Sequence, residues 1–224
     1  MIEVKNLKKL FKDGEKTTEV LKGIDFLAKS GEFVAIMGRS GAGKSTLLYQ
    51  MSLLDEPTSG DIKIDEKDVL ALSTAERTSF RLSQLGYVFQ DYALLPEMTA
   101  LENVAIPLLM QNLPEKKAYA KAAEHLTLVG LGERLNNLPS QLSGGEQQRV
   151  SIARAIAHEP KILFADEPTA NLDNESSRIV MDIFKKLHSE GQTIIMVTHE
   201  VEYSKFAERI IHLDNGQIIS DERV

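Results

Sequence analysis

Apolar residues recur with a strand-like period at the start of the chain. Residues 2–7 and 20–28 alternate apolar and polar side chains, as half-buried antiparallel strands do. Residues 32–38 are nearly all apolar and stop at a cluster of glycines, which predicts a strand buried on both faces. Residues 45–54 then follow a helical pattern, and residues 56–65 predict a turn and another strand.

The middle of the chain is mainly helical. After an apolar strand at residues 85–90, helical periodicity extends from residue 98 to about residue 131, and the alanine-rich stretch 115–129 is its clearest part. A polar, glycine-marked loop at residues 135–146 leads into a further predicted helix at residues 147–158. The run of helices between strands predicts an inserted helical lobe.

Strands and helices alternate again toward the C-terminus. Residues 161–168 and 193–200 are apolar strands that end in acidic or imidazole side chains. The amphipathic helix at residues 179–191 lies between them, with Gly191 placed to end it. Such alternation predicts a mainly parallel sheet.

These elements predict an α/β fold organised as a single domain over residues 1–224. We expect its core to comprise about residues 1–90 and 160–224 and to include an N-terminal antiparallel β subdomain. We expect the inserted α-helical lobe to comprise about residues 91–159.

Composition argues against several kinds of partner and site. A chain of 224 residues with 42% hydrophobic residues can bury a substantial core. Its formal net charge of -7 argues against a nucleic acid partner, because phosphate backbones need a dense basic face. The absence of cysteine excludes disulfides and thiolate metal sites. Since no stretch reaches the ~18 apolar residues of a membrane helix, we expect any membrane role to come through a partner.

A glycine-rich segment between a predicted strand and a predicted helix fits the phosphate-loop pattern GxxxxGK[ST]. Its backbone N–H groups and the following helix dipole favour a bound phosphate. Lys44 is expected to neutralise β- and γ-phosphate oxygens, Ser45 to offer its hydroxyl to Mg²⁺, and Thr46 to add a phosphate contact. The alternative is a turn that only links strand to helix. The segment comprises Gly38, Arg39, Ser40, Gly41, Ala42, Gly43, Lys44 and Ser45.

Two adjacent carboxylates, Asp166 and Glu167, close a later apolar strand. Ligands of open parallel sheets bind beyond the carboxyl ends of strands. Neighbouring strand residues point to opposite faces, so the two acids can act differently. We expect Asp166 to hold Mg²⁺ through water and Glu167 to polarise an attacking water. Taken alone, this strand end is also compatible with a solvated turn.

A second glycine-marked helix start lies at Ser143, Gly144 and Gly145. Its free N–H groups, dipole and hydroxyl predict a second anion site. The alternative is a local cap made by Ser143 or Glu146. One triphosphate hardly needs two anion sites in one chain, which suggests that two chains share each nucleotide.

Together these motifs resemble the nucleotide-binding domain of ABC transporters over essentially the whole chain. In order, they are GRSGAGKST, the glutamine of VFQ, LSGGEQQR, ILFADE, NLD and the histidine of VTH. The resemblance implies a P-loop NTPase fold, ATP and Mg²⁺ as ligands, and ATP hydrolysis. It also implies a head-to-tail homodimer that forms on ATP binding.

The resemblance assigns the signature residues to the partner's nucleotide. Ser143, Gly144 and Gly145 of one copy are implied to cover the γ-phosphate bound by Lys44 of the other copy. Glu146 is included in this nucleotide-binding set.

Three more residues receive roles only through the resemblance. Gln90 is implied to touch Mg²⁺ or the lytic water and to report occupancy of the site. Asp173 is implied to link the two sites of the dimer, and His199 to hold the γ-phosphate with Glu167.

The resemblance also implies an aromatic residue near the N-terminus that stacks on adenine, commonly a tyrosine. Phe11 is the candidate here, and core packing is the alternative. Arg39 and Ala42 stand where many relatives carry proline and serine. Both positions mainly offer backbone, so phosphate binding is expected to survive these differences.

The chain further resembles a subgroup of lipoprotein-releasing, macrolide-exporting and cell-division ATPases (LolD, MacB and FtsE types). This implies a separate integral membrane permease subunit, and hence a peripheral location at the cytoplasmic face of the cell membrane. The segment from Gln90 to Pro107 is expected to receive that subunit. Packing within the chain is the alternative for its candidate contacts, which are Leu94, Leu95, Pro96 and Met98.

The leading functional hypothesis is an ATPase that powers export or extraction of a substrate. The alternative is a mechanotransmitter that regulates a membrane partner, of the cell-division or sensor type, without moving a substrate. A DNA-repair or chromosome ATPase would carry a long coiled coil or zinc cysteines, and this sequence has neither. A translation factor of the family would carry two cassettes, and the chain has room for one.

Overall fold

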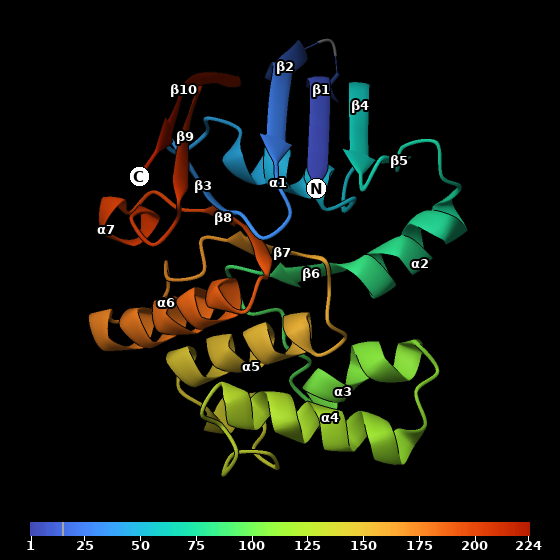
Figure 1. Cartoon of the computed structure of the whole chain (residues 1–224), viewed down its shortest axis with the longest axis vertical. Coiled ribbons are helices and arrows are strands. Elements are labelled where there is room, and N and C mark those ends of the chain that lie inside the picture. The colour runs from blue at the N-terminus through green and yellow to red at the C-terminus, as the bar shows by residue number, and fades with distance from the viewer. Residues whose placement is uncertain (15) are drawn as a thin grey trace. The chain divides into compact units, whose positions relative to one another are not determined.

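The computed structural model describes residues 1–14 and 16–224, which fall into two compact units (Figure 1). Unit 1 comprises Met1–Arg81 and His188–Val224, and unit 2 comprises Leu82–Leu187. Unit 1 holds the phosphate loop, whereas unit 2 holds the acidic strand end and the signature segment.

Unit 1 contains an antiparallel sheet with the strand order β2-β1-β4-β5. Its strands are β1 (Ile2–Asp13), β2 (Lys16–Ala28), β4 (Ser59–Ile64) and β5 (Lys67–Asp68). Ile2 pairs with Ala28 on β2 and with Ile64 on β4, and all three side chains are buried. The antiparallel pairing predicted from alternating side chains is therefore confirmed.

The second sheet of unit 1 is mainly parallel. Its strands β10, β9, β3 and β8 are neighbours in that order. They span Phe33–Met37 (β3), Thr193–Val197 (β8), Arg209–Asp214 (β9) and Gln217–Arg223 (β10). β3 runs parallel to both β8 and β9, and β10 returns antiparallel along β9. Every residue of β3 and β8 is buried, as their continuous apolar sequence predicts.

Among the residues that the structure describes, three helices belong wholly or mostly to unit 1. Helix α1 (Lys44–Met51) buries Leu47, Leu48 and Met51, which gives the predicted helix after the glycine-rich loop its apolar face. Helix α2 (Thr74–Gln84), which lies mostly in this unit, has no buried residue along its described length. Helix α7 (Val201–Ser204) is a single turn.

Unit 2 combines a short parallel strand pair with packed helices. The strands are β6 (Leu85–Val88) and β7 (Ile162–Asp166), which pair in parallel. The helices are α3 (Ala100–Met110), α4 (Glu115–Leu128), η1 (Pro139–Gln141), α5 (Gly144–Ile156) and α6 (Asn174–Ser189), the last ending just beyond the unit. Helices α3, α4 and α5 pack on one another around Val104, Leu108, Leu126 and Val150, which are buried (Figure 1).

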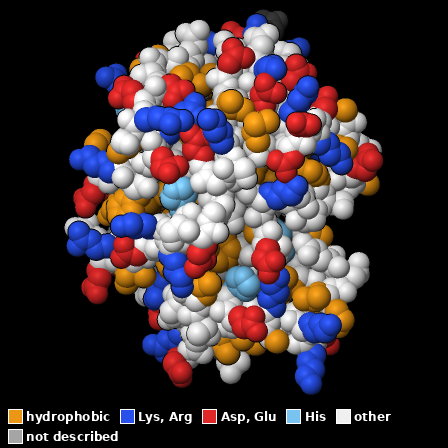
Figure 2. Space-filling model, in the orientation of Figure 1, with side chains coloured by type: hydrophobic (Ala, Val, Ile, Leu, Met, Phe, Trp, Pro, Cys, Tyr) orange, Lys and Arg blue, Asp and Glu red, His pale blue; other side chains and the backbone are white. Residues whose placement is uncertain are grey.

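Charges of both signs are interspersed over the face drawn in Figure 2, where Lys and Arg alternate with Asp and Glu. Within the described residues, no helix combines the length and the apolar character needed to cross a membrane.

Candidate functional site

The phosphate loop leaves β3 at Gly38 and enters α1 at Lys44. A Cβ at Gly38 would lie 2.1 Å from the carbonyl oxygen of Leu213, so no side chain fits there. Gly43 caps α1 with φ 101°, a left-handed conformation that glycine adopts without steric cost. The backbone of the fold therefore requires glycine at these two positions of the motif, independently of any ligand.

Lys44 is only 6% exposed, and its ammonium donates to the carbonyl oxygen of Arg39 at 3.2 Å. The loop therefore curls around the lysine head group. Ser45 and Thr46 are half-buried in the first turn of α1, whereas Arg39 and Ser40 are exposed. The helix N-terminus, the ammonium and the two hydroxyls are gathered within one short segment, as an anion site requires.

His199 lies at the same sheet edge as the phosphate loop. Ile36 of β3 pairs in parallel with Val197 of β8, and the Thr198 amide donates to the Ile36 carbonyl oxygen at 3.1 Å. His199 follows directly and is exposed. Unit 1 thus brings the loop and the predicted γ-phosphate histidine to the carboxyl ends of adjacent strands.

Unit 2 gathers a second set of predicted residues at one edge. Val88 of β6 pairs with Ala165 of β7, so Gln90 and the Asp166–Glu167 pair follow the carboxyl ends of adjacent strands. Asp166 is 4% exposed, and the hydroxyl of Tyr87 donates to its Oδ2 at 3.4 Å. Gln90 is exposed and Glu167 half-buried.

Glu167 has a φ of 44°, which is uncommon for a residue with a side chain. Gln148, which is fully buried on α5, donates through Nε2 to the carbonyl oxygen of Pro168 at 2.9 Å. Sequence reasoning gave Gln148 no role of its own, although it lies inside the signature motif. Its bond holds the backbone next to the predicted catalytic carboxylate.

Ser143 caps α5 in a reciprocal arrangement with Glu146. The Ser143 amide donates to Glu146 Oε2 at 2.9 Å, and the Glu146 amide donates to Ser143 Oγ at 3.3 Å. The hydrogen bond from the Ser143 backbone is the main reason that the pKa of Glu146 lies below its usual value. Ser143 and Glu146 thus form the local cap that was the alternative interpretation, and the second anion site stays a prediction. Both bonds leave the serine hydroxyl proton for another acceptor.

The two signature glycines are closely packed. A Cβ at Gly145 would lie 2.5 Å from Ser176 Oγ, and one at Gly144 would lie 2.9 Å from Tyr92 Oη. Ser176 also donates through its amide and its hydroxyl to Asp173, at 2.8 and 2.9 Å. These bonds hold the pKa of Asp173 below its usual value. Asp173 thus caps α6, and its link to a second copy stays a prediction.

Phe11 lies on β1 with 46% of its area exposed, which excludes the core-packing alternative. The Lys9 ammonium lies 5.0 Å from the centre of the Phe11 ring. Stacking of this ring on adenine stays a prediction.

The segment predicted to contact a membrane subunit exposes apolar side chains. Leu95 is 44% and Met98 38% exposed, and Pro96 is exposed as well, whereas Leu94 is half-buried. Single exposed apolar residues are normal, so this exposure does not test the predicted contact, which stays a prediction.

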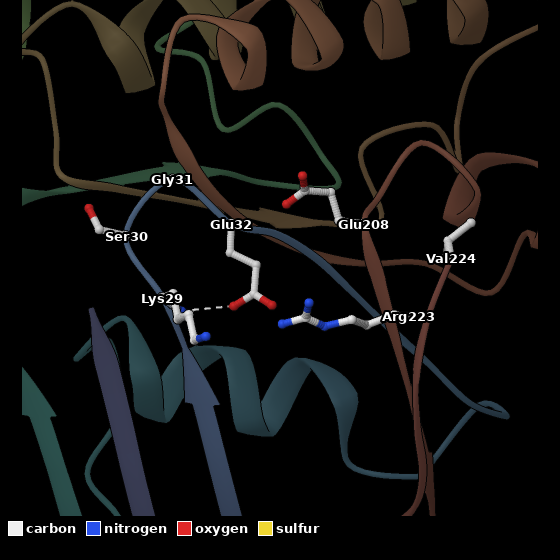
Figure 3. A pocket seen from close by; sticks show the side chains of 7 residues that line it. All are labelled: Lys29, Ser30, Gly31, Glu32, Glu208, Arg223 and Val224. Carbon is white, nitrogen blue, oxygen red and sulfur yellow. Dashed lines mark hydrogen bonds between the residues drawn. The ribbon is translucent and has the colours of Figure 1, made fainter.

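A cavity of about 390 Å³ in unit 1 belongs to a different end of the sheet (Figure 3). Its lining residues are Lys29, Ser30, Gly31, Glu32, Glu208, Arg223 and Val224. Figure 3 shows the Arg223 guanidinium directed toward the Glu32 carboxylate. Gly31 and Glu32 precede β3, whereas the phosphate loop follows it, so a strand length of about 16 Å separates the two places.

The phosphate loop of unit 1 suits a bound phosphate chain, because it offers backbone amides, the buried Lys44 ammonium and the Ser45 hydroxyl. The strand end of unit 2, taken by itself, offers the carboxylates of Asp166 and Glu167. Magnesium prefers oxygen ligands of this kind.

Comparison with known proteins gives the same family throughout. A sequence profile described as ABC transporter matches residues 21–170. An ABC transporter ATP-binding protein of Methanocaldococcus jannaschii is 49% identical, with 98% of each chain covered. The lipoprotein-releasing ATP-binding protein LolD of Aquifex aeolicus is 46% identical, with 99% of this chain and 97% of LolD covered.

The macrolide export protein MacB of Aggregatibacter actinomycetemcomitans is 46% identical over 99% of this chain, which spans 34% of MacB. Among solved structures, a dimeric ATP-binding cassette bound to ADP and phosphate is 41% identical, with a TM-score of 0.93. That alignment covers 100% of this chain and 98% of the cassette. The predicted α/β P-loop NTPase fold is thereby confirmed. The chain belongs to the ABC transporter family, as one of its ATP-binding subunits.

Proposed function

We propose that this chain is the ATP-hydrolysing subunit of an ABC transporter that powers export or extraction of a substrate through a separate membrane subunit. The observation that carries the proposal is the glycine-rich phosphate loop around the buried Lys44. The chain that contains this loop matches LolD over nearly the full length of both proteins. The chain acts as one ABC ATPase domain in this proposal.

Unit 1 binds the nucleotide through the phosphate loop. Backbone amides of residues 38–43 and the N-terminus of α1 face the phosphates, and Lys44 neutralises the β- and γ-phosphate oxygens. Thr46 adds a hydroxyl contact, His199 holds the γ-phosphate, and the exposed ring of Phe11 stacks on adenine.

In this proposal the hydrolytic step depends on Glu167. Glu167 orients and polarises a water molecule that attacks the γ-phosphorus, and His199 helps to hold the γ-phosphate in line. Ser45, Gln90 and Asp166 would hold Mg²⁺, which supplies charge neutralisation at the phosphates when bound. The left-handed backbone at Glu167 is a conformation that functional sites often carry.

A second copy completes the site in this proposal. Ser143, Gly144, Gly145 and Glu146 of one copy cover the γ-phosphate held by the other, and Asp173 links the two sites. The relative with a TM-score of 0.94 was solved as a dimer, which supports a homodimer here. ATP binding closes the dimer and hydrolysis reopens it, because only the closed state contacts the nucleotide from both sides.

The membrane subunit binds along residues 90–107, where Leu95, Pro96 and Met98 are exposed. The chain then lies at the cytoplasmic face of the membrane and is peripheral to it. The relatives named LolD and MacB act in lipoprotein release and macrolide export, and they support export or extraction as the class of work.

Two variants separate binding from hydrolysis. We expect Glu167→Gln to retain ATP affinity within about threefold and to lose at least about a hundredfold in turnover, because only the water-activating group changes. We expect Lys44→Ala to weaken ATP binding itself. Titration calorimetry and phosphate release measure the two effects. Near-normal turnover by Glu167→Gln would remove this residue from the proposed role.

A further inference from the structure

We infer that Arg154, on α5, is a positioning residue for Gln90. Its guanidinium fixes the backbone directly after Gln90 and thereby sets where the glutamine side chain is presented. This inference deepens the proposed function and rests on the role given there to Gln90.

The backbone after Gln90 has an unusual conformation. Tyr92 and Ala93 are consecutive residues with φ values of 61° and 50°. A left-handed residue that is not glycine is strained. Outside a two-residue hairpin turn, two in succession persist where neighbouring groups hold them.

Arg154 is the neighbour that holds them. Nη2 donates to the Tyr92 carbonyl oxygen at 2.9 Å, and Nη1 donates to the Ala93 carbonyl oxygen at 2.6 Å. One planar fork therefore binds both strained residues at once, with two fixed donor directions that a lysine ammonium lacks.

The guanidinium is half-buried at this place. Desolvation lowers the pKa of Arg154 to about 10, so the side chain keeps its charge at neutral pH. A desolvated cation that binds two carbonyl oxygens makes stronger hydrogen bonds than a neutral donor does.

A second contact fixes the other side of the same segment. Asn171 Nδ2 donates to the Gln90 carbonyl oxygen at 3.2 Å and to Asp91 Oδ1 at 3.3 Å. The Tyr92 hydroxyl donates to the Asn171 carbonyl oxygen at 3.4 Å. Residues 90–93 are thus held by α5 on one side and by the loop before α6 on the other.

These contacts couple the position of α5 to the position of Gln90. Arg154 lies on the helix that begins at the Ser143 cap, so a displacement of α5 moves the two carbonyl oxygens that it binds. An error of about 1 Å in the placement of a catalytic group can cost about a hundredfold in rate. Arg154 therefore affects hydrolysis without touching the nucleotide.

The first test is amide hydrogen exchange of residues 89–96 in the whole chain without nucleotide. We expect exchange of the amides of residues 89–95 in Arg154→Lys to be at least about tenfold faster than in the wild type, because the fork is lost; Pro96 has no amide hydrogen. The matched control is Arg81→Lys: Arg81 Nη1 donates at 2.9 Å to the carbonyl oxygen of Leu53, another left-handed residue with φ 60°. Unchanged exchange in Arg154→Lys, or equal acceleration of this segment in the control, would overturn the inference.

The second test is ATP turnover in a double-mutant cycle with Gln90→Ala. We expect Arg154→Lys to lower kcat about tenfold with KM within about twofold, and the double variant to be no slower than Gln90→Ala alone. Losses that multiply would mean a general structural effect and would contradict the positioning role. If the wild type hydrolyses no ATP, the proposed function fails, and the exchange result still decides whether Arg154 holds the segment.

Discussion

At the phosphate loop, steric crowding requires glycine at one position and leaves open space at another. Gly38 is crowded by the backbone of Leu213, whereas Gly41, in the same loop, has no atom within 4 Å of an added Cβ. The motif pattern predicted glycine at both positions for phosphate contact alone. The crowding at Gly38 involves a strand about 175 residues later in the chain, and no local pattern encodes such a contact.

We expect Gly38→Ala to lower the free energy of unfolding by about 3 kcal/mol, because a methyl group 2.1 Å from the Leu213 carbonyl oxygen forces the backbone apart. The matched control is Gly191→Ala, where φ is 93° and nothing lies within 4 Å. That change should cost only about 1 kcal/mol. Urea unfolding measures both, and equal losses would show that crowding at Gly38 is unimportant.

Asn103 organises the exposed segment that we propose to face the membrane subunit. Its side-chain oxygen accepts from the Leu95 amide at 2.8 Å, and its Nδ2 lies 3.0–3.1 Å from the carbonyl oxygens of Leu95, Met98 and Thr99. Asn103 is fully buried.

Asn103→Ala should therefore destabilise the chain by about 2–3 kcal/mol, since buried groups lose their partners. The exposed Asn136→Ala should stay within about 0.5 kcal/mol of the wild type in the same unfolding assay. A similar small effect of Asn103→Ala would contradict the organising role.

Elements with strong periodicity were predictable, and those without it were not. The apolar strands β3, β7 and β8 and the alanine-rich helix α4 appear where the sequence placed them. Helix α2 was not predicted, since only Ala75, Phe80 and Leu82 of its 11 residues are apolar and none of them is buried.

The hairpin of β9 and β10 was also missed, although the chain carries a signal for it. Asn215 and Gly216 have φ values of 46° and 77°, and an Asn-Gly pair between strands is a strong hairpin indicator. Ile219, in the middle of β10, is 67% exposed. Burial does alternate along β10, but Ser220 is half-buried where Ile219 is exposed, so the sequence lacks the matching alternation of apolar and polar residues.

An ion pair at the end of this hairpin predicts a pH dependence. Arg209 Nε and Nη2 donate to the two carboxylate oxygens of Asp221, each at 2.6 Å. The hydrogen bond from Arg209 holds the pKa of Asp221 below its usual 3.8. The folded chain thus keeps this carboxylate charged to lower pH than the unfolded chain does. Its stabilising contribution is complete above the ordinary pKa and is lost as the pH falls through the lowered one.

We therefore expect Asp221→Asn to lower Tm by about 2 °C at neutral pH, because a partly exposed pair contributes modestly. The difference from the wild type should shrink as the pH is lowered below 3.8. Thermal unfolding across a pH series measures it. Asp214→Asn, at an exposed position on β9, serves as control. A difference that persists undiminished at the lowest pH would contradict this account of the pair.

At the scale of the whole molecule, the sequence predicts a site that two copies share. A single chain carries only its own part of that site. Motif order indicated the family, and the family is confirmed. The structure brings Gln90, Asp166 and Glu167 to one edge of unit 2, and the phosphate loop and His199 to one edge of unit 1. In the single chain, Ser143 accepts a hydrogen bond from the Glu146 amide and caps α5. Its proposed ligand is the nucleotide that a second copy binds.

Ser143→Arg tests this shared use of the signature serine. The variant should bind ATP as the wild type does, because the phosphate loop is untouched, and should lose at least about a hundredfold in turnover as the long cation blocks the second copy. Ser30→Arg is the control, since Ser30 is exposed near the opposite end of β3. Calorimetry and phosphate release measure both variants. Unaffected turnover in Ser143→Arg would argue for a site that one chain completes alone.

The most direct measurement is the specific rate of ATP hydrolysis as a function of protein concentration, with the molecular mass followed by light scattering in the same samples. If two chains enclose each ATP, the specific rate rises with concentration, and ATP-loaded Glu167→Gln has the mass of a dimer. A full specific rate in samples that remain monomeric throughout turnover would contradict the account.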